Sequence, residues 1–218
     1  MDTPEWNSRM LRGQMAACLD RGLPGPTAQR LFEPELAYGR HAGPAAADAR
    51  LAAVLVLAYW HETNWFVPTI VRTQGMRDHA GQIALPGGAV DPGETPIQTA
   101  LRELEEELGA GPDAIDVLGE LTPLYVFNSN FQVQPFLGLC ASRPHFQPSA
   151  AEVAELIEIP LPVLREAENH GAHEIRRRGV VFSAPHIQIG QHRIWGATAM
   201  ILAEFMALMS QCAALGGN

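Results

Sequence analysis

The chain has 218 residues, of which 47% are hydrophobic, and it carries a formal net charge of −9 at pH 7. This length is enough for one full domain with a buried core, together with an appendage. Contacts to nucleic acid phosphates require a concentrated basic surface, so the acidic balance argues against nucleic acid as a partner.

The basic residues and the cysteines limit how this chain could bind phosphate or a metal. All 15 basic residues are arginines, so any bound phosphate is held by guanidinium groups, backbone N–H groups or a metal. Cys18, Cys140 and Cys212 lie far apart and outside any CxxC spacing, which predicts neither a disulfide framework nor a zinc site. The N-terminus has no apolar signal region, and we therefore expect a cytoplasmic protein.

Residues 1–50 are predicted to be an N-terminal helical appendage and linker. The stretch "NSRMLRGQMAACLD" has a helical composition, and the following "RGLPGPT" interrupts it with two prolines and two glycines. An alanine-rich connector then leads to Arg50. The main domain is predicted to span residues 51–215.

Apolar runs typical of strands dominate the main domain. The first is "LAAVLVLAYW", from residue 51. Helices are predicted near residues 96–108, 162–170 and 197–214. Strand runs with only occasional helices favour an α+β fold, with a mixed β-sheet sandwiched between α-helices. Further strands are predicted at Trp65–Arg72, Gln82–Leu85, Ile115–Leu121 and Leu124–Cys140.

The most apolar stretch is "ATAMILAEFMALMSQCAAL", which includes Glu204 and Gln211. It falls short of the roughly 20 clean apolar residues of a membrane span. We therefore expect no membrane association. A buried terminal helix and a homodimer face are the two interpretations that remain.

The helix near residues 96–108 has clear start and stop signals. Thr95 suits the N-cap, Pro96 the first helical position, and Gln98 completes a capping-box spacing. Gly109 is expected to end the helix in the left-handed conformation. The apolar residues recur at three- and four-residue steps and predict a stripe that packs on the sheet. This stripe consists of Ile97, Ala100, Leu101, Leu104 and Leu108.

Acidic residues flank this stripe. Glu103, Glu106 and Glu107 fall within a sector of roughly 100° of the helix, where like charges repel one another. A hard divalent cation such as Mg²⁺ would reverse that repulsion, because it prefers oxygen ligands and commonly uses carboxylates.

The wider pattern from Gly88 to Ala110 resembles the Nudix hydrolase signature, G-x5-E-x7-R-E-U-x-E-E-x-G-U, where U is apolar. Every invariant position matches, and only the last apolar position is a small residue. The resemblance implies a Nudix fold and metal-dependent hydrolysis of a nucleoside diphosphate linked to another group, with Mg²⁺ or Mn²⁺ as cofactor. It also implies metal ligands at Glu103, Glu106 and Glu107, with the Gly88 carbonyl as a further candidate.

The same resemblance implies that Glu94 and Arg102 form a structural ion pair. The general base remains open between Glu106, Glu107 and a carboxylate from a later loop. Glu152 and Glu155 are the candidates there, since "EVAELIEIPL" resembles a run found downstream in many relatives. The alternative for both is a solvated position at the start of a strand.

The segment before the signature, "RTQGMRDHAGQIALPGG", resembles the motif of the coenzyme A pyrophosphatase branch of Nudix hydrolases. "HRIWGATAMIL" resembles the element that opens the last helix of that branch. The resemblance implies a substrate with several phosphates. Arginines could contact phosphate bidentately, and histidine and glutamine could donate hydrogen bonds. The implied substrate-binding residues are Arg72, Arg77, His79, Gly81 and Gln82.

The function expected from these resemblances is hydrolysis of coenzyme A or acyl-coenzyme A to 3′,5′-ADP and 4′-phosphopantetheine or its acyl form. The sequence departs from the branch motif at Pro68-Thr69-Ile70, Thr73 and Leu85. These departures keep open a Nudix hydrolase acting on ADP-ribose, NADH or a nucleoside triphosphate. A non-catalytic, nucleotide-sensing Nudix domain is the third alternative, although such a domain would be expected to lose metal carboxylates.

Overall fold

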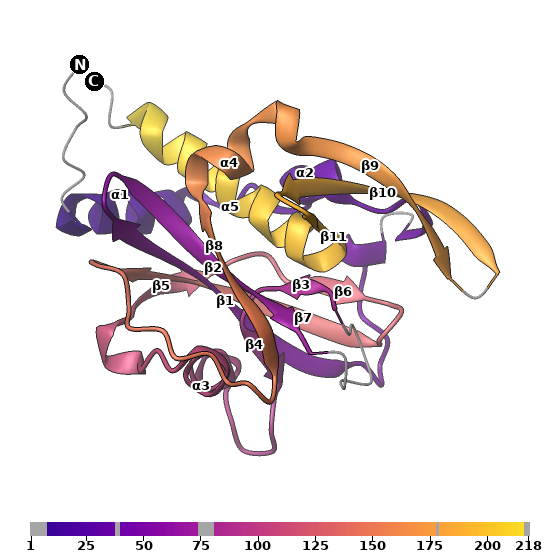
Figure 1. Ribbon diagram of the computed structural model, residues 1–218, viewed down its shortest axis with the longest axis horizontal. Helices are drawn as coiled ribbons and strands as arrows, with labels where there is room; N and C mark the ends of the chain where they lie inside the picture. Colours follow the sequence, from indigo (N-terminus) through magenta and orange to yellow (C-terminus); the bar gives the residue numbers. More distant parts are fainter. Residues whose placement is uncertain (1–7, 38–39, 74–80, 178, 216–218) are drawn as a thin grey trace.

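A mixed eight-stranded sheet forms the centre of the protein (Figure 1). The structure is a computed structural model, and it describes residues 8–37, 40–73, 81–177 and 179–215. Strand β1 (Arg50–His61) runs parallel to β7 (Phe131–Cys140) over ten residue pairs, while its other pairings are antiparallel. The other strands of this sheet are β2 (Asn64–Arg72), β3 (Ile83–Ala84), β4 (Gly87–Ala89), β5 (Asp116–Glu120), β6 (Leu124–Val126) and β8 (Val153–Pro160).

Helices cover both faces of this sheet, as Figure 1 shows. Successive side chains of β1 point to opposite faces, so its continuous apolar run supplies two cores. Ala53, Leu55, Leu57 and Tyr59 pack towards α3 (Pro96–Leu108). The alternate residues of β1 belong to the core formed with α5 (Gly196–Leu215). The predicted α+β sandwich is therefore confirmed.

Strand β1 has different antiparallel neighbours along its length. It pairs with β2 only at Tyr59–His61, next to the turn, and with β4 at Ala52–Val54. The Leu55 N–H donates to the Pro86 carbonyl at 3.0 Å. The "PGG" segment is thereby attached to the central strand, immediately before the helix that carries the acidic residues.

The N-terminal segment packs on α5 and not only on itself. Met15 and Cys18 from α1 (Ser8–Arg21) and Phe32 are at most 3% exposed, and all three belong to the core that α5 forms with the sheet. The remaining elements of the segment are α2 (Gly25–Gln29), η1 (Arg30–Phe32), η2 (Glu35–Ala37) and η3 (Arg40–Ala42). The boundary predicted at residue 50 stays a prediction.

Most predicted elements match the structure, but strands β4 and β8 were not predicted, and further differences lie between residue 124 and the last helix. The predicted run Leu124–Cys140 is two strands, β6 and β7, separated by a turn. The predicted helix at 162–170 is shorter than expected, because α4 (Leu161–Arg165) is followed by η5 (Ala167–Asn169). A short 3₁₀ helix, η4 (Pro112–Ala114), precedes β5. The sequence analysis did not predict a second, three-stranded sheet. This sheet consists of β9 (His170–Arg177), β10 (Val180–Ile189) and β11 (His192–Trp195).

Within the described residues, α5 is the one helix whose length and composition would allow it to cross a membrane. Over Gly196–Ala213, 56% of this helix is buried inside the protein, and Ile201, Leu202 and Phe205 are at most 2% exposed. Burial of this kind is typical of a core helix, which is one of the two interpretations that the sequence left open.

Candidate active site

Helix α3 is built as its sequence predicts. The Thr95 N–H donates to Gln98 Oε1 at 2.9 Å, which completes the capping box. Gly109 adopts the left-handed conformation, with φ of 69°, and its N–H donates to the Glu105 carbonyl. Leu104 and Leu108 are fully buried against the sheet. This packing sets which side of the helix carries the glutamates.

Three carboxylates meet beside α3. Glu103, Glu107 and Glu152 each offer an oxygen, and these atoms lie within 4.8 Å of one another. Glu152 comes from the loop before β8. The loop is joined to the end of α3 by the Ser149 N–H, which donates to the Glu107 carbonyl at 2.9 Å. The Thr73 N–H, just after β2, donates to the Glu152 carbonyl at 3.1 Å. We call Glu103, Glu107 and Glu152 the acidic cluster.

Glu107 is the most enclosed member of the acidic cluster, with no exposed surface. Burial raises the pKa of its carboxyl to about 8, an effect that Arg72 and the Gly87 N–H oppose. The Gly87 N–H donates to Glu107 Oε2 at 3.0 Å, and Arg72 Nη1 lies 3.4 Å from Glu107 Oε1. Burial with few hydrogen-bond donors disfavours the ionised form of this carboxyl, and a bound cation would stabilise that form.

Glu103 lies against the backbone of Gly88. Burial raises the pKa of the Glu103 carboxyl, while Arg102 opposes the shift. A Cβ atom at Gly88 would lie 2.2 Å from Glu103 Oε1, so the close approach depends on glycine having no side chain. The predicted Gly88 position is therefore next to the acidic cluster.

A second group of charges surrounds Arg102. Its guanidinium makes a two-pronged contact with Glu94, at 2.8 Å from Nε and 3.1 Å from Nη2. Hydrogen bonds from Arg102 and Thr99 lower the pKa of Glu94 to about 2. Arg102 Nη1 also contacts Glu103 and Glu106, each at 2.9 Å. The pair links the loop after Gly88 to α3.

Two of the predicted acidic residues lie apart from the acidic cluster. The Glu106 side chain is 51% exposed and forms an ion pair with Arg102. The Glu155 side chain is 50% exposed, and its Oε2 lies 3.2 Å from Nε2 of His192. Of the two late-loop candidates for the general base, only Glu152 reaches the other carboxylates. The roles of Glu106 and Glu155 stay predictions.

The upstream motif is described at its two ends. The Gly81 N–H donates to the Arg72 carbonyl at 3.0 Å, and the Arg72 N–H donates to the Gln82 carbonyl at 3.1 Å. Gly81 has a φ of 70°, a conformation that glycine adopts readily. These bonds join Arg72 to Gly81 and Gln82. Arg77 and His79 lie outside the described residues.

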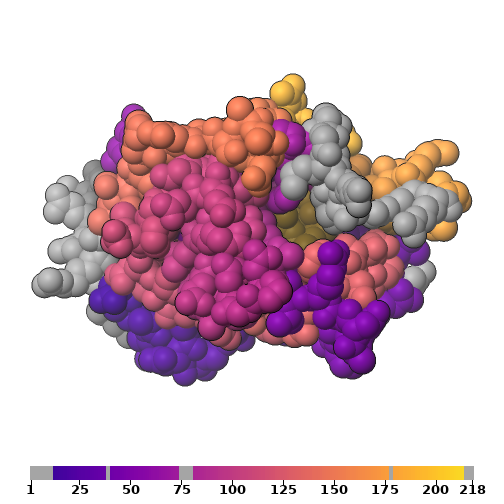
Figure 2. All heavy atoms as spheres, turned by 90° about the horizontal axis from the view of Figure 1, so that it is seen from below, coloured from indigo at the N-terminus to yellow at the C-terminus, as the bar shows by residue number. Residues whose placement is uncertain are grey.

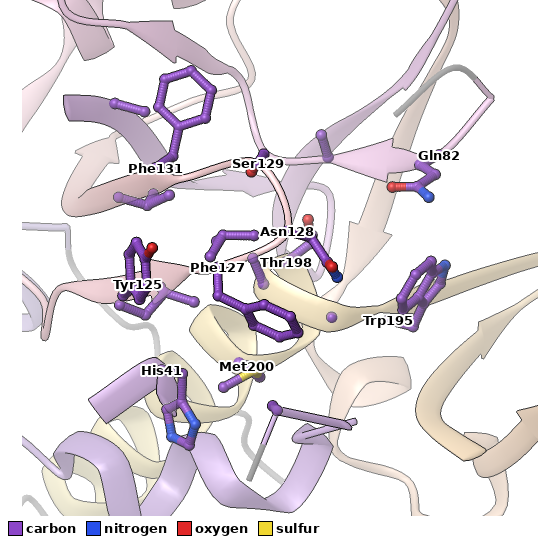
Figure 3. Close-up of a pocket in the computed structure, with 18 of the residues that line it drawn as sticks. His41, Gln82, Tyr125, Phe127, Asn128, Ser129, Phe131, Trp195, Thr198 and Met200 are labelled. Atoms are coloured by element: carbon purple, nitrogen blue, oxygen red, sulfur yellow. The ribbon is translucent and has the colours of Figure 1, made fainter. Parts of the chain in front are cut away.

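A cavity of about 480 Å³ adjoins the acidic cluster. Arg72, Gln82, Gly87 and Gly88 line it on the side of the cluster. The surface view shows it as a hollow with part of α5 on its floor (Figure 2). The close-up in Figure 3 shows side chains from several segments around it. Its aromatic lining residues are Tyr125, Phe127, Phe131, Phe182 and Trp195, beside His41.

The sequence analysis missed this cavity lining. The turn between β6 and β7 contributes Phe127, Asn128 and Ser129, and the start of α5 contributes Thr198 and Met200. Thr198 and Met200 belong to "HRIWGATAMIL", which the sequence identified only as the start of the last helix, and Phe127, Asn128 and Ser129 belong to no quoted motif; long-range packing brings the two groups together. Among the described residues, the acidic cluster could hold a hard divalent cation. Its three carboxylates are the donor type that Mg²⁺ and Mn²⁺ prefer.

Comparison with known proteins agrees with this geometry. Residues 50–177 match the family model of the NUDIX domain. The chain is 39% identical over 165 residues to the "Uncharacterized Nudix hydrolase NudL" of Pectobacterium atrosepticum, covering 74% of this chain and 83% of that protein. It is 38% identical over 164 residues to the protein of the same name from Yersinia enterocolitica, covering 73% and 82%.

Solved structures share the fold. The Nudix hydrolase RenU from M. smegmatis aligns with a TM-score of 0.52 at 19% identity, covering 84% of this chain and 94% of that one. A MutT/nudix family protein from Enterococcus faecalis aligns with a TM-score of 0.53 at 18% identity, covering 83% and 72%. The chain therefore belongs to the Nudix family of enzymes, which hydrolyse nucleoside diphosphate derivatives.

Proposed function

We propose that this Nudix hydrolase cleaves the pyrophosphate bond of coenzyme A or an acyl-coenzyme A, using Mg²⁺ or Mn²⁺. The products would be 3′,5′-ADP and 4′-phosphopantetheine or its acyl form. The observation that carries the proposal is the position of Arg72 and Gln82. Both belong to the upstream motif and line the cavity beside the acidic cluster. A ligand in this cavity can therefore place a phosphate near the carboxylates.

The departures from the branch motif lie mainly in the protein core, which supports the proposal. Pro68, Thr69 and Ile70 are buried residues of β2, and they pair with β8 away from the cavity lining. Leu85 is 2% exposed, in the core that α5 forms with the sheet. Substitutions at such positions change the packing of the core and do not alter a side chain that lines the cavity.

The chemistry follows from the positions of the side chains. A divalent ion at the acidic cluster would polarise phosphoryl oxygens and lower the pKa of a bound water. Glu103 and Glu107 supply oxygens from adjacent turns of α3. The Gly87 N–H orients the Glu107 carboxylate by donating to Oε2. Arg72 lies between Glu107 and the cavity, where its guanidinium can contact an anionic substrate oxygen.

Glu152 is the residue that we assign as the general base. It belongs to the acidic cluster, and it is held on a loop that is fixed at both ends to the surrounding elements. A base must lie within hydrogen-bonding reach of the water it activates, and a water at the cluster would meet this condition. Glu155 is directed to His192 instead.

A substrate panel tests the proposal. The full-length protein is incubated with Mg²⁺ or Mn²⁺ and, separately, coenzyme A, acetyl-coenzyme A, ADP-ribose, NADH and dGTP, and products are identified by mass spectrometry. We expect 3′,5′-ADP from coenzyme A or its acetyl form, at the highest kcat/KM of the panel. A higher kcat/KM for ADP-ribose, NADH or dGTP would replace the coenzyme A assignment. Tight nucleotide binding without turnover of any member would favour the sensing role.

A further inference from the structure

One wall of the cavity comes from the N-terminal segment. Pro34, Leu36, Ala37 and His41 line the cavity, and Figure 3 shows His41 on its short helix beneath the other labelled residues. We call η2 (Glu35–Ala37), η3 (Arg40–Ala42) and Pro34 the N-terminal wall. The wall lies before residue 50, where the match to the NUDIX domain begins. It is therefore a part of the pocket that the family match does not account for.

A buried carboxylate on α5 fastens the chain that leads to this wall. Glu204 has no exposed surface. Its carboxylate accepts hydrogen bonds from the Gly25 N–H at 3.2 Å and from Gln29 Nε2 at 2.9 Å. On its other side it accepts bonds from the N–H of Thr122 at 3.2 Å and from the Thr122 hydroxyl at 2.5 Å.

The donors around Glu204 explain how a charged group can be placed in the core. A buried carboxylate is costly unless hydrogen-bond donors surround it, and here two backbone N–H groups, an amide and a hydroxyl do so. These donors belong to α2 and to the loop after β5. Glu204 consequently fixes three separate parts of the chain relative to one another. We call Glu204, Gly25, Gln29 and Thr122 the Glu204 junction.

The Glu204 junction is close in sequence to the wall. Helix α2 continues into η1, whose Phe32 is 1% exposed in the α5 core, and two residues later the wall begins. A further bond holds the wall itself: the Ser183 N–H of β10 donates to Glu35 Oε2 at 2.8 Å. The wall therefore has a fixed base at the junction and a contact with the small sheet.

We propose that Glu204 is a positioning residue for substrate binding, because it holds the N-terminal wall against the part of the cavity that lies away from the acidic cluster. The inference deepens the proposed hydrolase function and rests on it for its substrate. The wall contacts none of the three cluster carboxylates through any hydrogen bond found among the described residues. Loosening it should therefore weaken substrate binding while the metal-binding residues keep their geometry.

The test compares three variants with the wild type. Glu204→Gln keeps the shape of the side chain but replaces one acceptor oxygen with a donor that faces other donors. Ala37→Phe places a large side chain directly in the wall. Leu208→Ala removes a fully buried side chain from the same helix, and serves as the control for a general loss of stability. Kinetics are measured below the unfolding transition of each protein, with the panel member that the wild type hydrolyses best.

We expect KM to rise about tenfold in both Glu204→Gln and Ala37→Phe, with kcat within about twofold of the wild type. Leu208→Ala should retain the wild-type KM. Titration with Mn²⁺ alone, followed by electron paramagnetic resonance, should give the same affinity for all four proteins. A structural role alone would lower stability in Glu204→Gln and Leu208→Ala without the selective rise in KM.

Several outcomes would overturn the inference. One is an unchanged KM in folded Glu204→Gln, another is an unchanged KM in folded Ala37→Phe, and a third is an equal rise in KM in Leu208→Ala. If Glu204→Gln does not fold, Gln29→Met takes its place, because it removes the α2 side-chain donor to Glu204, and an unchanged KM in that variant overturns the inference. If the wild type hydrolyses no panel member, the proposed function has failed, and the wall is tested separately by calorimetric binding of coenzyme A and ADP-ribose to the same proteins. Equal dissociation constants for the wild type and Ala37→Phe would then show that the N-terminal wall does not contribute to ligand binding.

Discussion

Glu152 illustrates how much one side chain depends on distant backbone contacts. Its carboxylate lies near Glu103 and Glu107, and backbone bonds to the end of α3 and to Thr73 hold its loop there. The amides of Gln147 and Ser149 donate to the carbonyls of Leu108 and Glu107, which are among the last carbonyls of the helix. The bonds that satisfy the last carbonyls of α3 therefore also place Glu152 beside the other two carboxylates.

The first prediction concerns this carboxylate. We expect Glu152→Gln to lower kcat by about 100-fold or more, because an amide cannot accept a proton from water, while KM changes little. Glu155→Gln is the matched control from the same segment, and we expect nearly wild-type kinetics because Glu155 faces His192. Steady-state assays at saturating Mg²⁺ give both constants. Equal losses in the two variants, or none in Glu152→Gln, would remove Glu152 from the mechanism.

The second prediction separates two adjacent glycines. A Cβ at Gly88 would meet the Glu103 carboxylate, the movable end of a side chain. We expect Gly88→Ala to fold but to lose activity by about 100-fold, because misplacing a site group by about 1 Å has that effect. A Cβ at Gly87 would instead lie 2.3 Å from the Ala53 carbonyl oxygen, on a backbone with φ of 154°.

Because the backbone of β1 cannot give way, we expect Gly87→Ala to lower the free energy of unfolding by about 3 kcal/mol. Thermal melts of both metal-free variants and kinetic assays of the folded ones test the contrast. Full activity in Gly88→Ala would contradict the close approach to Glu103. A wild-type melting temperature in Gly87→Ala would contradict the tight fit against β1.

Helix α3 was predicted to its terminal residues because its signals are local. The cap at Thr95, the apolar period and the left-handed Gly109 each act within a few residues. Strands β9 and β10 were missed because their segment is rich in histidine and arginine and contains Pro185, so no apolar alternation stands out. These strands are held by pairing with one another, which is not visible in any single short stretch.

The third prediction concerns the link between the loop after Gly88 and α3. Hydrogen bonds from Arg102 hold the pKa of Glu94 at about 2, below its ordinary value of 4.5. A depressed carboxyl pKa stabilises the fold above about 4.5, and that stabilisation is lost as the pH falls towards 2. We therefore expect Glu94→Gln to melt at a lower temperature than the wild type at pH 7, with the difference shrinking between pH 5 and pH 3.

Glu105→Gln is the control for this experiment, because Glu105 is an exposed carboxylate of the same helix. Its effect on the melting temperature should be small at every pH. A difference between Glu94→Gln and the wild type that stays constant down to pH 3 would mean that the charge of Glu94 does not stabilise the fold.

At the scale of the whole molecule, the two cores differ in how far apart in the sequence their contributing segments lie. The core under α3 is formed mostly by β1, α3 and neighbouring strands, and local patterns indicated it. The core under α5 brings α1 and η1 together with the last helix of the chain. The cavity depends on this long-range packing, and sequence patterns therefore placed the acidic cluster better than the pocket beside it.

The last prediction tests whether the N-terminal segment is an appendage or a part of the same folding unit. Phe32 is 1% exposed, and its ring meets His170 edge to face at 5.0 Å between centroids. Truncating a buried phenylalanine to alanine typically costs about 3–5 kcal/mol through lost burial and the cavity left behind. Leu104→Ala in α3 provides a reference from the opposite core, at about 2–5 kcal/mol.

If the segment folds with the domain, Phe32→Ala lowers the single unfolding transition by an amount comparable to Leu104→Ala, in urea melts followed by circular dichroism. If residues 1–50 were an independent appendage, the main transition would stay at the wild-type urea midpoint. We expect the first outcome, because Phe32 shares its core with Leu202 and Phe205 of α5. Phe32 also lies two residues before the N-terminal wall, so the start of the wall should unfold together with the domain.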